Sequence, residues 1–467
     1  AGAAVNIGTV TGNTIGSGSG TSSISVTTST TGGRTFGIWS SGLSSVRIDN
    51  NTIGSITGNG STTGISASLT GIQATGGAST ISNNLVGSIT TANSLNAATS
   101  STSGTGQQVT GILRSNSSLS ITNITGNTVS NLNNNYTGTS SSGRVCGIVT
   151  SDGWNNIIGN TVCNLSTTSQ NTSTASTQSV CGISATGPAV SGNLVHSLAN
   201  TTASAGVSVT GILIGSGTLS FEGYGVAGNL VHSLAVASTS ASSVVNGMQL
   251  LDVGSGRTIT AQNNMVRVGI AAGGTSTAGA SLVRGIFDNA TASGRNFYHN
   301  SVYVGGTQTS GTSGTFAFQS TGVTNPRKFQ NNIFVNARGN SGATSKHYAV
   351  NYGGTTVNPA GLTAGGNIFH APGTANGGVL GFFNRAAQTP IAAWRAATGQ
   401  DATSAVADPL FVNPAGDATA VDLHLQPSNP AESGALPIMA VTVDFDAETR
   451  SMLTPADIGA DAGNFTV

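Results

Sequence analysis

The chain has 467 residues, of which only 5% are aromatic and 6% are charged, and 67 are glycine. A polar composition of low charge is common in disordered segments. The regular spacing of Ile, Val and Leu argues against disorder here, because a disordered tract has no reason to keep apolar residues in register. No run of 18 apolar residues occurs, which excludes a membrane-spanning helix.

The formal net charge is zero, but the charges are unevenly placed. Residues 1–400 hold 14 Lys/Arg and 5 Asp/Glu, a net +9, whereas residues 401–467 hold 1 Lys/Arg and 10 Asp/Glu, a net −9. Either two differently built segments have different compositions, or the two ends are electrostatically complementary between subunits. A positive excess spread this thinly does not predict nucleic-acid binding.

A short phrase recurs along the chain. Gly-Asn-Leu-Val-His-Ser-Leu at residues 192–198 returns almost unchanged at 228–234. Looser copies place an asparagine at intervals of 32 to 43 residues, beginning at Asn13. A nearly fixed period in this range is typical of a solenoid. The asparagines predicted to form a ladder are Asn51, Asn84, Asn127, Asn160, Asn193, Asn229, Asn264, Asn300, Asn332 and Asn367.

Each copy predicts a short strand entered through a tight bend. We expect the asparagine to adopt the left-handed conformation at this bend and to pass amide hydrogen bonds to the next rung. A second phrase, Gly followed by an apolar residue, predicts another strand in each period, as at Gly71-Ile72 and Gly147-Ile148. Two such strands per period cannot form amphipathic helices. The sequence therefore predicts a right-handed parallel β-helix of about eleven coils over residues 1–389.

Residues 1–35 contain no amphipathic helix that could cap the first rung. We expect either a fragment of a longer protein or coverage by another subunit, because an open edge invites strand pairing. No signal peptide is visible, which indicates a mature or excised product. Polar tracts such as 90–107 and 166–178 are expected to project as a column of loops.

Two small groups of residues have types that can bind metals or form disulfides. Cys146 and Cys181 are 35 residues apart and should lie on neighbouring rungs, either as a disulfide or metal pair or as two buried thiols. His196 and His232 share one repeat position, with Cys163 a coil earlier. A metal site there is one interpretation, and an outward-facing, solvated column is the other. We expect no metal and no cofactor.

Catalysis by a polysaccharide lyase or hydrolase would need converging acids or a positioned base. Asp252 and Asp288 are 36 residues apart and could be neighbours, or they are two surface acids near Arg257 and Arg284. No catalytic residue is assigned, and an enzymatic role stays open with a non-catalytic role favoured.

The stretch from 284 to 352 is the most aromatic and basic part of the repeats. Its aromatic residues are expected to fill a wider core. The same stretch offers the side chains of a glycan-binding face, for which the candidates are Arg284, Arg295, Tyr298, Tyr303, Arg327 and Lys328.

Residues 390–467 are predicted to form a C-terminal cap of one helix and short strands. Pro390 and Gly399 bound an Ala-rich helix whose Trp394 should point inward as a plug. Further motifs follow it: Thr398-Gly399-Gln400-Asp401, Asp408-Pro409-Leu410-Phe411, Leu423-His424-Leu425, Asn429-Pro430-Ala431, Asp444-Phe445-Asp446, Arg450 and Asp457-Ile458-Gly459-Ala460.

These motifs resemble the closing segment of secreted, pectin-lyase-like parallel β-helix surface proteins of Bacteroidota-type bacteria. The resemblance covers residues 390–461. Ala447 stands where that family has Gly, and we expect that the sorting domain such proteins often carry has been removed or truncated. The resemblance implies a secreted protein at the cell surface.

From these observations we expect an extracellular structural protein: a fibre or filament subunit, a surface-layer subunit or an adhesin stalk that assembles end to end. The alternative is a carbohydrate-active or glycan-binding β-helix with a polysaccharide partner. Ice binding is disfavoured, because the Thr-rich tracts vary in length from coil to coil.

Overall fold

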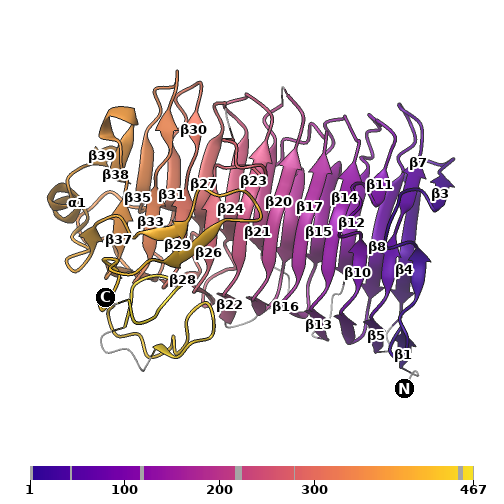
Figure 1. The fold of residues 1–467 in the computed structure, drawn as a ribbon, viewed down its shortest axis with the longest axis horizontal. Coiled ribbons are helices and arrows are strands. Elements are labelled where there is room, and N and C mark those ends of the chain that lie inside the picture. The colour runs from indigo at the N-terminus through magenta and orange to yellow at the C-terminus, as the bar shows by residue number, and fades with distance from the viewer. Residues whose placement is uncertain are drawn as a thin grey trace. The chain divides into compact units, whose positions relative to one another are not determined.

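The computed structural model describes residues 4–42, 45–115, 120–203, 205–215, 223–277, 279–450 and 456–465. The chain is all-β, with about 47% strand and 2% helix, and its parallel sheets form a β-solenoid of about 11 turns (Figure 1). The predicted parallel β-helix is therefore confirmed. Among the described residues, no helix is long and apolar enough to cross a membrane.

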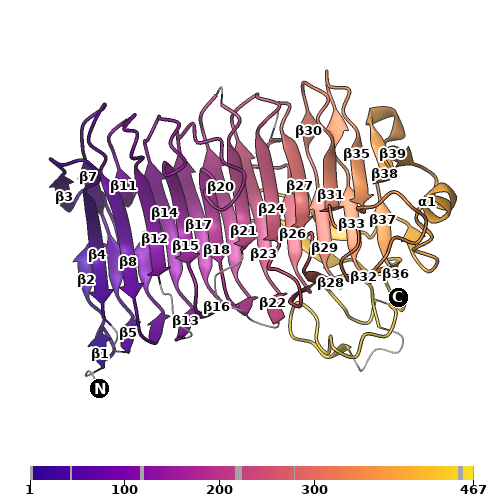
Figure 2. The same cartoon turned by 180° about the vertical axis from the view of Figure 1, so that it is seen from behind.

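The chain divides into two compact units, residues 1–221 with 235–244 and residues 222–234 with 245–467. Each unit has three parallel sheets, named A, B and C here, and each complete turn gives one strand to every sheet. Strands of one sheet lie side by side within a unit, as both views show (Figures 1 and 2).

The first unit contains six turns. Its sheet A consists of β1 (Val5–Ile7), β5 (Val46–Asp49), β9 (Ser79–Ser82), β13 (Ile121–Thr125), β16 (Trp154–Ile158) and β19 (Ala189–Ser191). Sheet B consists of β2 (Thr14–Gly16), β6 (Thr52–Gly54), β10 (Leu85–Gly87), β14 (Thr128–Asn134), β17 (Thr161–Thr167) and β20 (Leu194–Asn200), with β3 (Ile24–Thr27), β7 (Ile56–Asn59) and β11 (Leu95–Ala97) beside them. Sheet C consists of β4 (Arg34–Ser41), β8 (Ser68–Thr75), β12 (Gln108–Ser115), β15 (Arg144–Thr150), β18 (Val180–Ala185) and β21 (Ser208–Ile214).

The second unit contains five turns. Its sheet A consists of β22 (Gly223–Ala227), β25 (Thr258–Gln262), β28 (Gly294–Tyr298), β32 (Arg327–Gln330) and β36 (Leu362–Gly365). Sheet B consists of β23 (Leu230–Val236), β26 (Met265–Val268), β29 (Ser301–Val304), β33 (Ile333–Asn336), β37 (Ile368–His370) and β40 (Ala405–Val406). Sheet C consists of β24 (Val244–Leu251), β27 (Leu282–Asn289), β31 (Thr315–Ser320), β35 (His347–Asn351), β38 (Gly378–Phe383) and the antiparallel β39 (Ala386–Gln388). The remaining elements are β30 (Thr307–Gln308), β34 (Gly339–Asn340), β41 (Phe411–Asn413), β42 (Asp422–Leu425), the 3₁₀ turn Thr374–Asn376 and α1 (Ile391–Thr398).

A buried amide ladder runs through each unit. The Nδ2 of Asn127 donates to Oδ1 of Asn160 at 2.9 Å, and the backbone N–H of Asn127 donates to the same oxygen at 2.9 Å. That Nδ2 also donates to the carbonyl oxygen of Ile81 in the preceding turn, at 2.8 Å. Each asparagine thus ties three turns together. The Nδ2-to-Oδ1 chain links Asn13, Asn51, Asn84, Asn127, Asn160 and Asn193 in the first unit, and Asn229, Asn264, Asn300, Asn332 and Asn367 in the second.

The expected left-handed conformation of the ladder asparagines is wrong. The left-handed residue is the one immediately before each of them, for example Asn83 with φ 55° and Gly126 with φ 63°. Glycine occupies this preceding position in about half the turns because it adopts a positive φ without a steric penalty. The asparagine itself is selected for its amide, which both donates and accepts.

The glycines of the Gly-apolar phrase are explained by packing across the core. A Cβ on Gly147 would lie 2.3 Å from Cγ1 of Val162, the inward-facing valine of sheet B, and 2.6 Å from the carbonyl oxygen of Gly182. The same overlap recurs at Gly71 with Val86. Because the glycine of sheet C has no side chain, the valine of sheet B can pack directly against its backbone.

The polar tracts that follow sheet B are not simply projecting loops. Asn134 and Asn200 are buried, and their amides donate to main-chain carbonyls inside the coil. The loops between the strands differ in length from turn to turn without breaking the ladder. Asn84 and Asn127, for example, are hydrogen-bonded although they are 43 residues apart.

The core of the second unit is aromatic. Phe297, Phe318, Phe329 and Phe334 are fully buried, and Phe318 stacks on Phe334 with ring centroids 4.9 Å apart. The expectation that aromatic residues fill the core here is confirmed for these four residues. Pairs of this kind add about 1 kcal/mol each beyond their buried area.

The helix α1 closes the end of the second unit. Its C-cap is Gly399, which adopts the left-handed conformation and donates its backbone N–H to the carbonyl oxygen of Arg395. Its Trp394 is fully buried and packs against Tyr352, with ring centroids 4.9 Å apart. The predicted helix and its inward tryptophan are confirmed.

The rest of the predicted cap lies elsewhere. We call residues 408–465 the C-terminal strap, of which 451–455 are outside the described residues. The strap packs along the outer face of sheet B in the second unit, in yellow beside β26 and β29 in Figure 1. Its Leu423, Leu425 and Ile458 pack with Met265 and Ile333 of the sheet in one apolar cluster. The described residues between 390 and 465 are therefore an end plug followed by a lateral cover.

Hydrogen bonds fix the strap in register. The Nδ2 of Asn263 donates to the carbonyl oxygen of Val443 at 2.7 Å, and Ala460 N donates to Oγ of Ser301 at 2.9 Å. The guanidinium of Arg450 donates to the carbonyl oxygens of Gly459 and Ala460 at 2.7 and 2.8 Å. The strap is therefore an integral layer of the second unit.

The ladder yields a stability prediction. Replacing Asn160 by Ala leaves the backbone N–H of Asn127 without its acceptor, removes one of the acceptors of Asn127 Nδ2 and removes the donor to Ile124. We expect apparent unfolding stability to fall by about 3 kcal/mol, since each buried group left unpaired costs about 1–3 kcal/mol. Denaturant unfolding followed by circular dichroism measures the change.

A matched control is Asn156→Ala on the outer face of sheet A. Asn156 is half-buried and its amide donates to Asn123 at 2.9 Å. We expect this variant to lose no more than about 1 kcal/mol. Equal losses in the two variants would contradict a special role for the ladder.

Candidate functional site

The arginines of the aromatic and basic region serve the fold. Arg295 is buried, and its guanidinium donates to Oδ1 of the buried Asp288 at 2.7 Å and to the carbonyl oxygen of Leu251 at 2.6 Å. Arg327 donates to the carbonyl oxygens of Gly322 and Ala360. These guanidiniums satisfy carbonyl groups at the ends of strands, and their burial keeps them from a ligand in solution.

Arg284 is held in a similar way. Its Nε donates to Oδ1 of Asn246 at 2.9 Å, and its guanidinium carbon lies 3.6 Å from the centroid of the Phe287 ring. Burial lowers the pKa of Arg284 to about 9. Of the remaining candidates for a glycan-binding face, Lys328 is exposed and Tyr303 is half-buried, whereas Tyr298 is buried.

Tyr303 borders a pocket of about 330 Å³ between sheet B and the strap. His370, Asp408, Phe411 and Gln426 also line it. His370 Nε2 lies 3.8 Å from Oδ2 of Asp408, and the Tyr303 and Phe411 rings meet edge to face at 6.4 Å. The pocket thus combines aromatic walls with a polar edge.

The acids weighed as a catalytic pair are both engaged in structural bonds. Asp288 is not the surface acid that one interpretation expected, because it is buried and holds Arg295 and the hydroxyl of Ser320. Asp252 accepts hydrogen bonds from the backbone N–H groups of Thr291 and Ser293 and from their hydroxyls. Neither carboxylate is free to act on a substrate.

His347 is a buried neutral histidine beside this region. Its Nδ1 is 2.8 Å from Oγ1 of Thr315, and its Nε2 is 3.0 Å from Oδ1 of Asn340. Burial, with the charges of Arg338 and Lys346, lowers the pKa of His347 to about 4. The folded state therefore binds this proton more weakly than the unfolded chain.

This pKa predicts acid sensitivity. The stability contributed by neutral His347 is complete above the unfolded pKa of 6.5 and is lost as the pH falls towards 4. Between pH 7 and pH 4.5 we expect the native chain to lose about 2 kcal/mol more than the His347→Gln variant, which cannot titrate. Denaturant midpoints of both proteins at the two pH values test this, and parallel losses would contradict it.

Asp401 terminates the ladder of the second unit. The Nδ2 of Asn367 donates to Oδ1 of Asp401 at 2.9 Å, and the same carboxylate accepts Trp394 Nε1 at 2.9 Å and Ser404 Oγ at 2.6 Å. Burial raises the pKa of Asp401, against these hydrogen bonds, which lower it. The sequence placed Asp401 in a motif but did not indicate that it accepts the last ladder amide.

Replacing Asp401 by Asn should loosen the end plug. An amide group cannot accept from Asn367, Ser404 and Trp394 together, so we expect a loss of about 3 kcal/mol. Because Trp39 and Trp154 are 58% and 44% exposed, whereas Trp394 is fully buried, a red shift in fluorescence reports the plug. The exposed Asp408→Asn variant is the control, and an unshifted, equally stable Asp401→Asn protein would contradict this role.

The cysteines are free and buried. Cys146 and Cys181 are in register on β15 and β18, and burial raises the pKa of both thiols. This arrangement matches the interpretation as two buried thiols. They are inert packing groups rather than reactive thiolates.

The column of Cys163, His196 and His232 is less solvated than expected. Cys163 pairs in register with His196, but it is buried and its Sγ donates to Oγ of Ser130 at 3.2 Å. His196 is half-buried and His232 is buried. The solvated interpretation is therefore wrong for Cys163 and His232.

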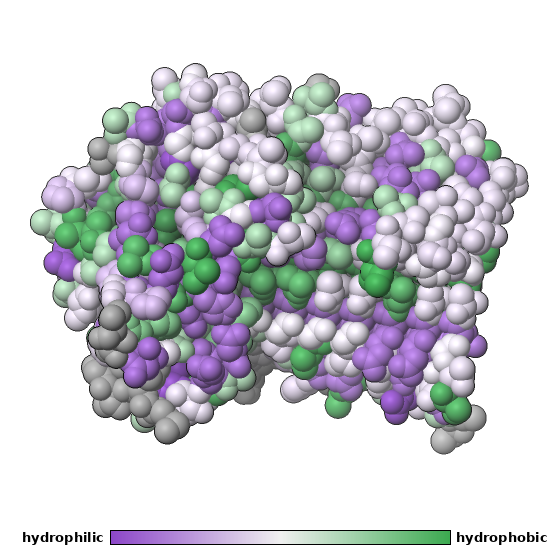
Figure 3. All heavy atoms as spheres, in the orientation of Figure 1, coloured by the Kyte–Doolittle hydropathy of each residue, from purple (hydrophilic) through white to green (hydrophobic). Residues whose placement is uncertain are grey.

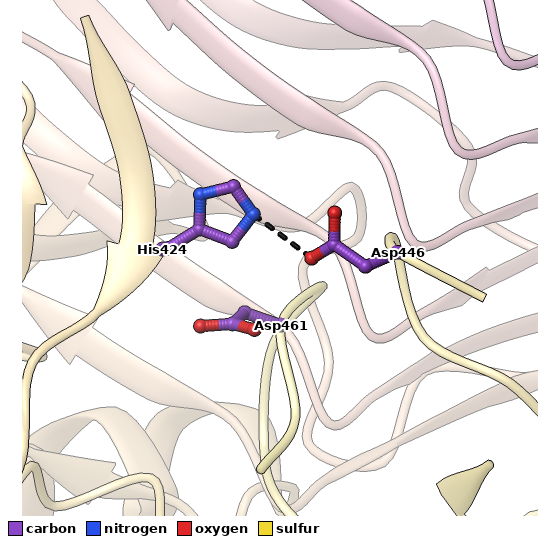
Figure 4. A group of neighbouring side chains, drawn as sticks. All are labelled: His424, Asp446 and Asp461. Carbon is purple, nitrogen blue, oxygen red and sulfur yellow. Dashed lines mark hydrogen bonds and ion pairs between the residues drawn. The ribbon is translucent and has the colours of Figure 1, made fainter. Parts of the chain in front are cut away.

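A cluster that the sequence analysis did not find lies in the strap. His424 of β42, Asp446 and Asp461 place one ligand-type atom each within 4.8 Å of one another (Figure 4). His424 Nε2 is 2.9 Å from Oδ2 of Asp446, and His424 Nδ1 is 2.6 Å from Oδ1 of Asp422. These residues come from three separate stretches without metal-ligand spacing, so no sequence motif indicated them.

A scan against protein-family models and a search of curated proteins gave no match to this chain. Function is therefore inferred from the geometry of the chain itself.

Proposed function

We propose that this protein is an extracellular structural protein, acting as a stalk or spacer at a cell surface. The observation that carries the proposal is the buried amide ladder, which makes each unit a self-supporting stack of turns. The acids weighed for catalysis and the arginines weighed for binding are used to hold backbone and side chains in place. These buried polar groups therefore stabilise the fold.

The surface fits such a role. Much of the face in Figure 3 is pale, the colour of residues of intermediate hydropathy, and only 6% of all residues are charged. A surface of this kind is rich in small polar residues and offers few charges for specific recognition. The resemblance of residues 390–461 to secreted β-helix surface proteins supports an extracellular location.

A stalk is favoured over a fibre built by stacking turns. At the end of the second unit, α1 and the antiparallel β39 cover the last turn, and Trp394 fills its core. A further subunit could pair with this end only after displacing them. The last turn therefore offers no open strand edge at this end for the end-to-end assembly that the sequence predicts.

Two measurements test the proposal. Immunogold labelling of the source cells is expected to place the protein on the outer surface, and electron micrographs of the purified chain at high concentration are expected to show separate particles. Labelling confined to the cell interior would contradict the extracellular role. Filaments that lengthen with concentration would contradict the stalk and favour a fibre.

The second candidate is a glycan-binding surface protein, favoured by the pocket beside Tyr303. Aromatic rings with a polar edge suit the apolar face and the hydroxyls of a sugar unit. Binding of the native chain on a glycan array, lost in Tyr303→Ala and retained in Lys328→Ala, is the expected result for this candidate. No binding by the native chain would remove it.

A further inference from the structure

The strap holds a group of acids that its own basic residues do not neutralise. Asp422, Asp444, Asp446 and Asp461 lie close to His424 or to one another, and Arg450 is the nearby arginine. Charged groups of one sign so close together repel unless a counter-charge is present. This imbalance favours the binding of a cation.

Asp461 gives an independent indication. The residue is 93% buried, since its relative exposure is 7%. Its Oδ2 accepts the backbone N–H of Leu425 at 2.7 Å, which fixes the carboxylate next to β42. A carboxylate that is largely buried and lies close to a second carboxylate costs free energy unless a cation or a proton is bound to it. Asp461 reaches this position beside His424 and Asp446 (Figure 4).

The neighbours of His424 orient it as a metal ligand. Oδ1 of Asp422 lies 2.6 Å from Nδ1 of His424 and orients the ring, so that Nε2 faces Asp446. Histidines that bind metals commonly donate their other ring N–H to a carboxylate in this way. Asp446 is 46% exposed at its side chain, so ions can enter from solvent and water can complete the coordination.

We propose that His424 Nε2, Asp446 and Asp461 bind one divalent cation of the Zn²⁺ or Mn²⁺ class. One imidazole nitrogen and two carboxylate oxygens suit these ions, whereas Ca²⁺ prefers oxygen ligands alone. The cation replaces the proton shared between His424 and Asp446, and that proton passes to solvent. Because the ligands are 22 and 15 residues apart along the chain, the ion cross-links three stretches of the strap.

The test is calorimetry and thermal unfolding of the full chain after treatment with a chelator, with Zn²⁺, Mn²⁺ and Ca²⁺ added separately. We expect one Zn²⁺ or Mn²⁺ per chain and a higher unfolding temperature. We expect Zn²⁺ affinity to fall at least tenfold in His424→Gln and in Asp461→Asn. Cobalt substitution should give the visible spectrum of a site with nitrogen and oxygen ligands.

The matched control is His370→Gln, which removes the histidine of another His–Asp pair in the same unit. This variant should bind like the native chain. No binding by the native chain, or binding that persists in both His424→Gln and Asp461→Asn, would overturn the proposal. A preference for Ca²⁺ that survives His424→Gln would also overturn it, because the imidazole would then not be a ligand.

Discussion

The interaction on which the rest of the structure depends is the hydrogen bond from the side-chain amide of one ladder asparagine to that of the next. Every link points the same way along the chain, and the backbone N–H of the asparagine joins the same acceptor. Aligned hydrogen bonds polarise one another and become stronger in a buried setting. In the second unit the chain of amides ends on the Asp401 carboxylate, the strongest acceptor that the side chains offer. The ladder and the end plug are thus one hydrogen-bonded system.

Arginine has a related role in the second unit. Arg338 donates to the carbonyl oxygens of Gly269 and Gly305, and Arg450 does the same for the closing turn of the strap. Bends between strands leave carbonyl groups that a neighbouring turn does not pair, and a buried guanidinium with five donors satisfies several at once. This explains why buried arginines gather in the second unit, where the core is aromatic. It also explains why these residues are poor candidates for contacting a glycan.

Much of the fold could be predicted from the sequence because a solenoid repeats its contacts at a fixed spacing. The asparagine positions and the inward Trp394 follow from local patterns. The left-handed residue was misplaced by one position because Asn and Gly both tolerate a positive φ, as the pair Asn50 and Asn51 illustrates. The place of the strap could not be predicted. Its apolar residues, such as Leu423 and Ile458, would fit the end of the solenoid or its side equally well, and only the three-dimensional surface of sheet B selects the side. The cluster at His424 was missed for the same reason.

The central claim is that the side-chain amides of the ladder are permanently paired in the folded protein. Hydrogen exchange of the carboxamide groups in protein labelled with ¹⁵N at asparagine tests this directly. The account predicts that ladder residues such as Asn127 and Asn300 exchange their Nδ2 hydrogens only as fast as the turns unfold, while the half-buried Asn96 and Asn156 exchange within the dead time. Equally fast exchange at all four residues would contradict the account.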